Sequence, residues 1–169
     1  MNKKILIVED EFVVANALRL TLEHAGYTVT GIASSAEEAD KQQQIQRPDF
    51  VLLDIQLDGK RSGIDLARKL NEDNIAFIYL SANSSQKILE EAKATDPYGF
   101  LIKPFREKDL LVTLEIAQYR YEQSREAKWR TEKLLQDKLY SIEKTTGDWT
   151  QKLIQTASVL QQYIPFDKR

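Results

Sequence analysis

The chain contains no cysteine and a single histidine, His24, among its 169 residues. This excludes disulfide bonds, a thiol nucleophile, thiolate metal sites and any metal site built from several histidines of one chain. Long apolar runs are also missing. The run that follows residues 1–4 has four apolar residues, fewer than a signal peptide or a membrane-spanning helix requires. We therefore expect a cytoplasmic protein whose chemistry depends on oxygen ligands and lysine.

No strong excess of one charge is present. The chain has 24 Lys and Arg against 26 Asp and Glu. Residues 1–105 carry a net charge of −4 and residues 106–169 a net charge of +2. Neither part is basic enough to predict nucleic-acid binding from charge. The length allows one domain of ordinary size with an appendage, and the 42% apolar content is that of a globular protein.

Short apolar runs alternate with helical patterns over the first two-thirds of the chain. The runs predict strands at residues 5–8, 27–33, 50–53, 75–80 and 99–102. Helical patterns lie near residues 12–24, 35–46, 63–71 and 85–94. Runs without polar alternation are typical of parallel strands that are buried on both faces. The sequence therefore predicts an α/β fold, a (βα)₅ doubly wound parallel sheet.

Polar residues follow the predicted strands. They are Glu9 and Asp10, Asp54, Ser81, and Lys103 with Pro104. A doubly wound sheet binds ligands beyond the carboxyl ends of its strands, so these side chains should converge on one edge. Three neighbouring carboxylates need a cation, and Mg²⁺ prefers oxygen ligands. A carboxylate nucleophile, a metal and a lysine together suit phosphoryl transfer.

Four segments carry a resemblance to a known family. They read KILIVEDE at 4–11, VLLDI at 51–55, LSA at 80–82 and YGFLIKPF at 98–105. In this order and spacing they resemble the receiver domain of two-component response regulators, over about residues 3–120. The resemblance implies a flavodoxin-like five-stranded sheet of order 2-1-3-4-5. It divides the chain into a receiver domain at 1–120 and a helical extension at 121–169.

The resemblance also implies a role for each strand-end residue. Asp54 would accept a phosphoryl group from a sensor histidine kinase or a phosphotransfer protein. Mg²⁺ or Mn²⁺ would be bound directly by Asp10 and Asp54, through water by Glu9, and by the backbone carbonyl of Gln56. Lys103 would hold the phosphoryl oxygens, next to a Lys103–Pro104 bond that is often cis in the family. Such a chain is not an enzyme with a separate substrate, because it acts only on its own phosphoryl group.

The resemblance also implies that two further residues change position when Asp54 is phosphorylated. Ser81 would move to the phosphoryl group, and Phe100 would swing inward and remodel the face made by residues 85–94, 99–102 and the helix that begins near 108. Gln56 and Asn83 occupy positions that tune dephosphorylation in the family. The chain departs from the family's usual residues at two of these positions. Position 9 is glutamate where aspartate is commoner, and position 100 is phenylalanine where tyrosine is frequent.

Other interpretations of the same residues remain open. Residues 9–11 alone could be an acidic helix start, and Phe100 could be a permanent core residue. Dehalogenase-type phosphatases also form an aspartyl phosphate, but they require a second aspartate where this chain has Gln56. Nucleotide-binding domains require a glycine-rich turn where residues 8–12 are acidic. A receiver that does not switch, and serves as a dimerisation or scaffold module through its C-terminal helix, is the alternative function.

The tail predicts long helices. Residues 108–144 contain no proline or glycine, so one helix should run to about 144, with a second at about 149–164. The first has 3-4 spacing at Leu114, Ala117, Tyr121, Ser124, Lys128, Thr131, Leu135, Lys138 and Ile142. It could form a coiled-coil homodimer or pack on its own domain.

The second helix has an apolar stripe at Leu153, Ala157, Leu160 and Ile164. Either a second copy covers this stripe or the protein continues into an output domain, since residues 160–167 resemble the opening helix of GAF-type sensory domains. No helix-turn-helix pattern follows the receiver, so direct DNA binding is not predicted. A membrane partner is not predicted either.

Overall fold

The computed structural model describes residues 2–82, 85–145 and 147–163. Asn83 and Ile164, which the sequence singles out, lie outside these ranges. The strands are β1 (Lys4–Val8), β2 (Thr28–Ala33), β3 (Phe50–Asp54), β4 (Ala76–Ser81) and β5 (Gly99–Ile102). The helices are α1 (Phe12–His24), α2 (Ala36–Ile45), α3 (Gly63–Glu72), α4 (Gln86–Lys93), α5 (Glu107–Lys144) and α6 (Trp149–Tyr163).

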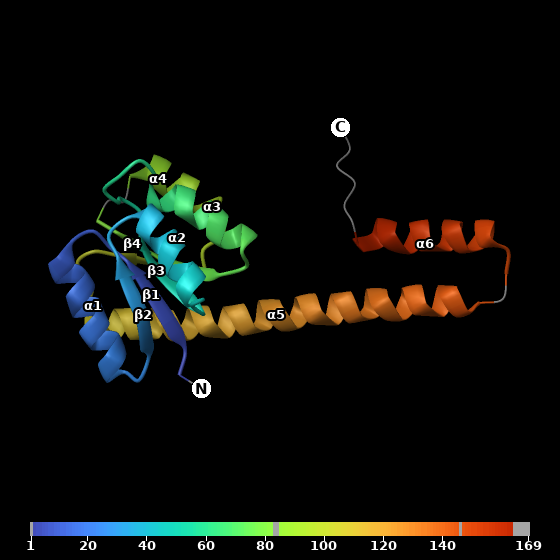
Figure 1. The fold of residues 1–169 in the computed structure, drawn as a ribbon, viewed down its shortest axis with the longest axis horizontal. Helices are drawn as coiled ribbons and strands as arrows, with labels where there is room; N and C mark the ends of the chain where they lie inside the picture. Colours follow the sequence, from blue (N-terminus) through green and yellow to red (C-terminus); the bar gives the residue numbers. More distant parts are fainter. Residues whose placement is uncertain (1, 83–84, 146, 164–169) are drawn as a thin grey trace. The chain divides into compact units, whose positions relative to one another are not determined.

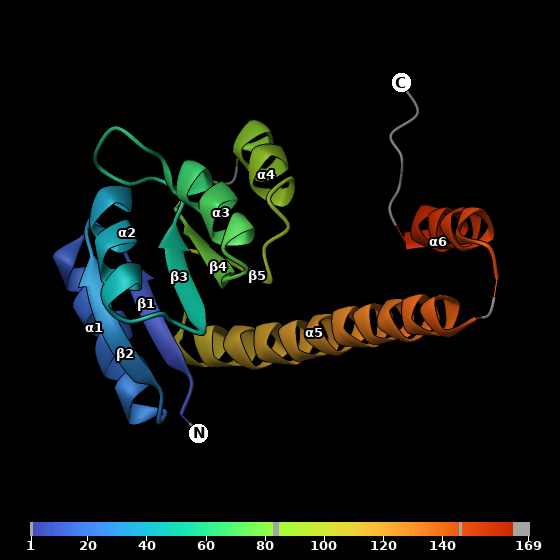
Figure 2. The same ribbon diagram turned by 45° about the vertical axis from the view of Figure 1, so that its right-hand side comes forward.

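The five strands form one parallel sheet of order β2-β1-β3-β4-β5. Helices α2, α3 and α4 cover one face of the sheet, while α1 and the first part of α5 cover the other (Figures 1 and 2). The predicted (βα)₅ fold and its strand order are therefore confirmed.

Both faces of the sheet are buried, which explains the unbroken apolar runs. Along β1, Leu6 and Val8 pack into the core under α2 and α3, whereas Ile5 and Ile7 pack into the core under α1 and α5. Successive side chains of a strand point to opposite faces. A strand covered on both sides must therefore be apolar at every position, and only its carboxyl end can carry polar groups.

Helix α5 begins in the first of two compact units and continues into the second. The chain consists of two compact units, Met1–Tyr121 and Glu122–Arg169. In the first unit Leu114 and Ala117 are fully buried under the sheet, and the ring of Tyr121 packs edge-on against Phe50, with centroids 5.5 Å apart. These three positions were predicted to belong either to a coiled-coil seam or to a helix that packs on its own domain. The chain's own sheet covers them, so this part of the stripe is not available to a coiled-coil seam.

The second unit contains the rest of α5 and the antiparallel helix α6 (Figures 1 and 2). Lys138 Nζ lies 3.4 Å from Gln162 Oε1 and 5.2 Å from the ring centroid of Tyr163. The predicted apolar stripe of α6 is largely open, since Leu153 is 52% exposed. Among the described helices, none combines the length and apolar character that crossing a membrane requires.

Candidate functional site

The carboxyl ends of four strands bring the predicted residues to one edge of the sheet. In the parallel register Val8 lies opposite Leu53, Asp54 opposite Leu80, and Ser81 opposite Ile102. The residues that follow β1 and β5 are therefore level with the last residues of β3 and β4. These polar residues are Glu9, Asp10, Asp54, Ser81 and Lys103.

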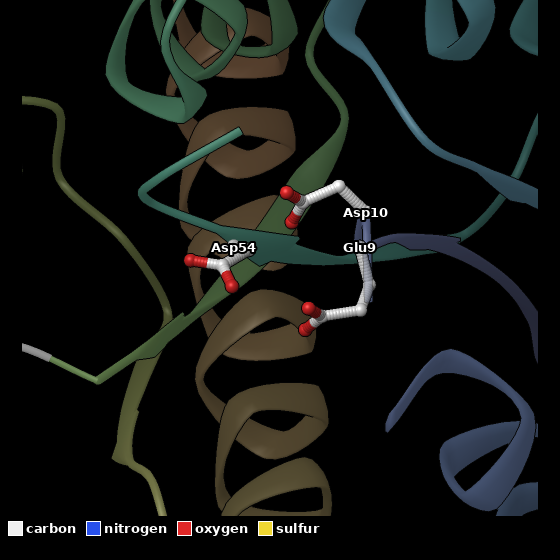
Figure 3. A group of neighbouring side chains, drawn as sticks. All are labelled: Glu9, Asp10 and Asp54. Carbon is white, nitrogen blue, oxygen red and sulfur yellow. The ribbon is translucent and has the colours of Figure 1, made fainter. Parts of the chain in front are cut away.

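Three carboxylates form the centre of this edge. Each of Glu9, Asp10 and Asp54 offers one oxygen, and the three oxygens lie within 4.8 Å of one another (Figure 3). Glu9 and Asp54 are 1% and 5% exposed, and Asp10 is half-buried. An all-oxygen donor set with excess negative charge fits a hard divalent cation. The residues present therefore match the metal site that the sequence predicts.

Lys103 provides a cation within the site. Its Nζ donates to Glu9 Oε2 at 2.6 Å and to Asp54 Oδ2 at 2.5 Å, and its side chain is 13% exposed. Burial alone would lower the pKa of Lys103, but hydrogen bonds to Asp54 and Glu9 outweigh it, so the pKa is raised. The lysine therefore stays charged and neutralises two buried carboxylates.

Glu9 is the more strongly desolvated partner of Lys103. Burial raises the pKa of the Glu9 carboxyl, and the nearby charge of Asp54 acts in the same direction. The hydrogen bond from Lys103 and a long one from the backbone N–H of Glu11, at 3.4 Å, oppose this rise only in part. Glu9 therefore takes up a proton at a higher pH than an ordinary glutamate.

The carboxylate of Asp54 is held from two sides. Lys103 contacts Oδ2, while the backbone N–H of Gln56 donates to Oδ1 at 2.9 Å. This fixes the orientation of the carboxylate at the end of β3, the middle strand of the sheet. The Gln56 carbonyl as a metal ligand stays a prediction.

Ser81 and Phe100 lie beside this centre. Ser81 is 1% exposed, and its backbone oxygen accepts the Lys103 N–H at 2.8 Å. The Phe100 ring is half-buried and packs edge-on against Tyr79, with centroids 6.0 Å apart. The Lys103–Pro104 bond is cis, as the resemblance implied. The switch roles of Ser81 and Phe100 stay predictions.

Sequence reasoning missed Gly63, the first residue of α3. A Cβ added there would lie 2.0 Å from the backbone oxygen of Asp54 and 2.9 Å from the Cα of Ile55. The glycine therefore allows α3 to start directly against the strand end that carries Asp54. One signal was available, because glycine is a poor residue within a helix and here it follows the capping residue Ser62.

An apolar groove also escaped sequence reasoning. It has a volume of about 580 Å³ and lies beside Lys103, between α1 and the start of α5. Its apolar lining includes Val13, Val14, Ala17, Leu18, Pro104 and Phe105. Val13, at its α1 side, is 79% exposed, and its neighbour in the sequence, Phe12, is 76% exposed. Two bulky apolar residues in the first turn of a helix, off its buried stripe, were the available signal.

The sequence matches one family model, and its relatives agree with that match. The model describes the response regulator receiver domain and matches residues 5–115. The transcriptional regulatory protein PdtaR of Mycobacterium tuberculosis is 32% identical over 120 residues, which are 70% of this chain and 58% of that protein. The alkaline phosphatase synthesis transcriptional regulatory protein PhoP of Bacillus subtilis is 35% identical over 114 residues, 65% of this chain and 46% of that protein. The chain thus spans about half the length of these relatives.

Solved structures show the same fold. The signal receiver domain of a modulated diguanylate cyclase from Desulfovibrio desulfuricans is 32% identical, with a TM-score of 0.69 over 73% of this chain and 99% of that one. The N-terminal domain of a response regulator/sensory box/GGDEF protein from Carboxydothermus hydrogenoformans is 31% identical, with a TM-score of 0.66 over 72% of this chain and 98% of that one.

Proposed function

Because the chain belongs to the response regulator receiver domain family, we propose that it works in a two-component phosphorelay by accepting a phosphoryl group on Asp54. One observation carries this proposal. The Asp54 carboxylate is oriented by the Gln56 N–H and by Lys103, at the edge that also holds Glu9 and Asp10. A fixed carboxylate with balanced charge is what in-line phosphoryl transfer requires of an acceptor.

The transfer forms one bond and breaks one. An oxygen of Asp54 attacks the phosphorus of a phosphohistidine, and an acyl phosphate P–O bond forms as the P–N bond breaks. The electron pair of that bond returns to the histidine nitrogen. Lys103 stays close to the new phosphoryl oxygens and balances their charge. A bound Mg²⁺ or Mn²⁺, held by Asp10 and Asp54 and through water by Glu9, would supply further charge neutralisation.

The donor is a sensor histidine kinase or a phosphotransfer protein in this proposal. The apolar groove between α1 and the start of α5 supports a docking place for it, because the groove adjoins Lys103. Val13 in its lining and the neighbouring Phe12 are exposed apolar residues that offer area a partner can bury.

The output surface is the α4–β5–α5 face. Phosphorylation would draw the Ser81 hydroxyl to the phosphoryl group and the Phe100 ring inward. On this face Val112, Ile116 and Tyr119 form one stripe along α5 and are 43%, 55% and 65% exposed. Ile102 of β5, in the same unit, is 52% exposed. These apolar side chains support a homodimer through this face, through the C-terminal helix, or through both.

Intact-mass measurement tests the proposed acceptor. Wild-type protein incubated with a small phosphodonor and Mg²⁺ should gain the mass of one phosphoryl group. Asp54→Asn should gain none, because an amide cannot form the acyl phosphate. A wild type that gains no mass would refute the proposal, and a phosphoryl group retained by Asp54→Asn would place the acceptor elsewhere. Continuous turnover of the donor would favour a phosphatase-type enzyme, and helix-mediated association unaffected by the donor would favour the scaffold alternative.

Mg²⁺ binding should weaken on acidification, and it should begin to do so above the pH at which an ordinary glutamate titrates. The pKa of Glu9 is raised from 4.5, so protons compete with the metal at a higher pH than that. Isothermal titration calorimetry across the acidic range measures this dependence. Glu9→Gln cannot take up the proton, so its weaker binding should vary less with pH. An identical pH dependence in the two proteins would contradict the assignment of the competing proton to Glu9.

A further inference from the structure

The loop that follows β3 connects the acceptor to α3. It begins with Gln56, whose N–H contacts Asp54 Oδ1. Leu57 packs partly against the core, whereas Gln56, Asp58 and Lys60 are exposed. Gly59 has a φ of +131°, so the chain turns there in a conformation open mainly to glycine. The exposed middle of the loop has little packing of its own, and its position depends on how its two ends are held.

The far end of the loop is held by α2. Arg61 Nη1 lies 2.6 Å from Asp40 Oδ2, and Lys69 Nζ of α3 lies 2.9 Å from Asp40 Oδ1. The Asp40 side chain is 19% exposed and that of Arg61 32%. Each oxygen of one carboxylate therefore holds a different cation, one from the loop and one from the helix that follows it.

Asp40 is suited to be a fixed anchor. Its helix is secured to the sheet by Ala36 and Ala39, which are fully buried. Burial by itself would raise the pKa of the Asp40 carboxyl, but hydrogen bonds from Lys69 and Arg61 outweigh it and lower the pKa. Asp40 therefore keeps its negative charge at neutral pH.

We propose that Asp40 is a positioning residue for the acceptor: through Arg61 it holds the β3–α3 loop so that the Gln56 N–H stays on Asp54 Oδ1. This rests on the proposed function of Asp54. Four residues, 57–60, lie between Gln56 and Arg61, and the exposed ones resist displacement only weakly. Release of Arg61 lets the loop shift, and Asp54 then loses one of the two contacts that orient it.

Two variants that each remove one charge separate this role from general stabilisation. Asp40→Asn removes the charge that holds Arg61, whereas Lys69→Gln removes the other partner of the same carboxylate and leaves the Arg61 contact. The resonance of the Gln56 backbone amide is to be recorded in ¹H–¹⁵N correlation spectra of the metal-free protein. Its resonance should move or broaden in Asp40→Asn and stay in place in Lys69→Gln. Asp40→Glu, which keeps the charge, should restore it in part.

The rate of phosphoryl incorporation from a small phosphodonor with Mg²⁺ is the second measurement. We expect it to fall about fivefold in Asp40→Asn, the scale of a modest misplacement of a reacting group, and to stay within about twofold in Lys69→Gln. Asp40→Asn with an unchanged Gln56 resonance would overturn the proposal, and so would equal rate losses in the two variants. If wild type itself accepts no phosphoryl group, the proposed function fails, and the Gln56 resonance alone decides the positioning role.

Discussion

Lys103→Met is expected to lower the free energy of unfolding of the metal-free protein by about 3 kcal/mol near neutral pH, the scale for removing one partner of a buried ion pair. Lys103 Nζ lies 2.5 Å from Asp54 Oδ2 and 2.6 Å from Glu9 Oε2. The glutamate side chain has no exposed area and that of Asp54 is 7% exposed. Without the lysine, two buried negative charges remain close together with neither water nor a cation to neutralise them. Urea unfolding curves recorded without divalent cations measure the change.

The deficit of Lys103→Met should depend on pH in a defined direction. Burial and the Asp54 charge raise the pKa of Glu9, and the variant lacks the lysine that opposes this rise. The folded state of the variant therefore binds more protons than the unfolded state, and its stability falls as pH rises. The deficit is therefore largest at neutral pH and shrinks as pH falls through the acidic range. In the wild type the pKa of Lys103 is raised above its ordinary value of 10.5. The stability that Lys103 contributes is therefore fully present below pH 10.5, and it is lost as pH rises through the folded-state pKa.

Two controls identify the cause of that deficit. Glu9→Gln combined with Lys103→Met removes one of the two stranded charges and should be more stable than Lys103→Met alone. Added Mg²⁺ should stabilise Lys103→Met more than wild type, because the metal replaces the missing cation and binds only the folded state. A metal-free variant within about 0.5 kcal/mol of wild type, the range of an ordinary surface substitution, would show that the lysine is not the counterion of this site.

The sheet could be predicted because each strand is specified by local sequence. Residues 5–8 are apolar at four consecutive positions, and β1 is buried at each of them. Such a run fits a strand covered on both faces. The strand ends then follow without tertiary information, since parallel strands bring their carboxyl ends to one edge. This is why Asp10, Asp54 and Lys103 could be grouped from the sequence alone.

The tail shows where local patterns stop being sufficient. The 3-4 spacing at Leu114, Ala117 and Tyr121 correctly indicated an apolar stripe on a helix. An apolar stripe does not indicate which surface covers it. In this protein the chain's own sheet covers these three residues. The same spacing is compatible with a coiled coil and with packing on a sheet, because both bury one face of a helix.

Contacts across the chain could not be read from sequence spacing either. Asp40 and Arg61 are 21 residues apart, and each alone resembles an ordinary solvated charge. Their contact depends on how α2 and the β3–α3 loop pack. The same holds for Gly63, whose lack of a side chain matters only because Asp54 turns its backbone oxygen toward it. These residues support the site without contributing chemistry, and only the packed structure reveals them.

Gly63→Ala is expected to lower the free energy of unfolding by about 3 kcal/mol, at the upper end for adding a methyl group to a packed site. The new Cβ would lie 2.0 Å from the Asp54 oxygen and 2.9 Å from the Ile55 Cα. Both are backbone atoms of the acceptor strand and cannot rotate away. Either α3 shifts or the strand end moves, and a moved strand end also misplaces the Asp54 carboxylate. Thermal and urea unfolding measure the first effect, and the rate of phosphoryl incorporation measures the second.

Gly31→Ala is the matched control for this backbone argument. Its added Cβ would lie even closer to a neighbour, 1.9 Å from Gln42 Oε1, but that neighbour is the end of a flexible side chain. Gln42 can rotate aside and would lose its hydrogen bond to the Ile32 oxygen, which is 2.7 Å long, at a cost of about 1 kcal/mol. Phosphoryl incorporation should then be unchanged. Equal losses of stability in the two variants would mean that α3 yields at Gly63 without strain, and that the glycine does not set the position of Asp54.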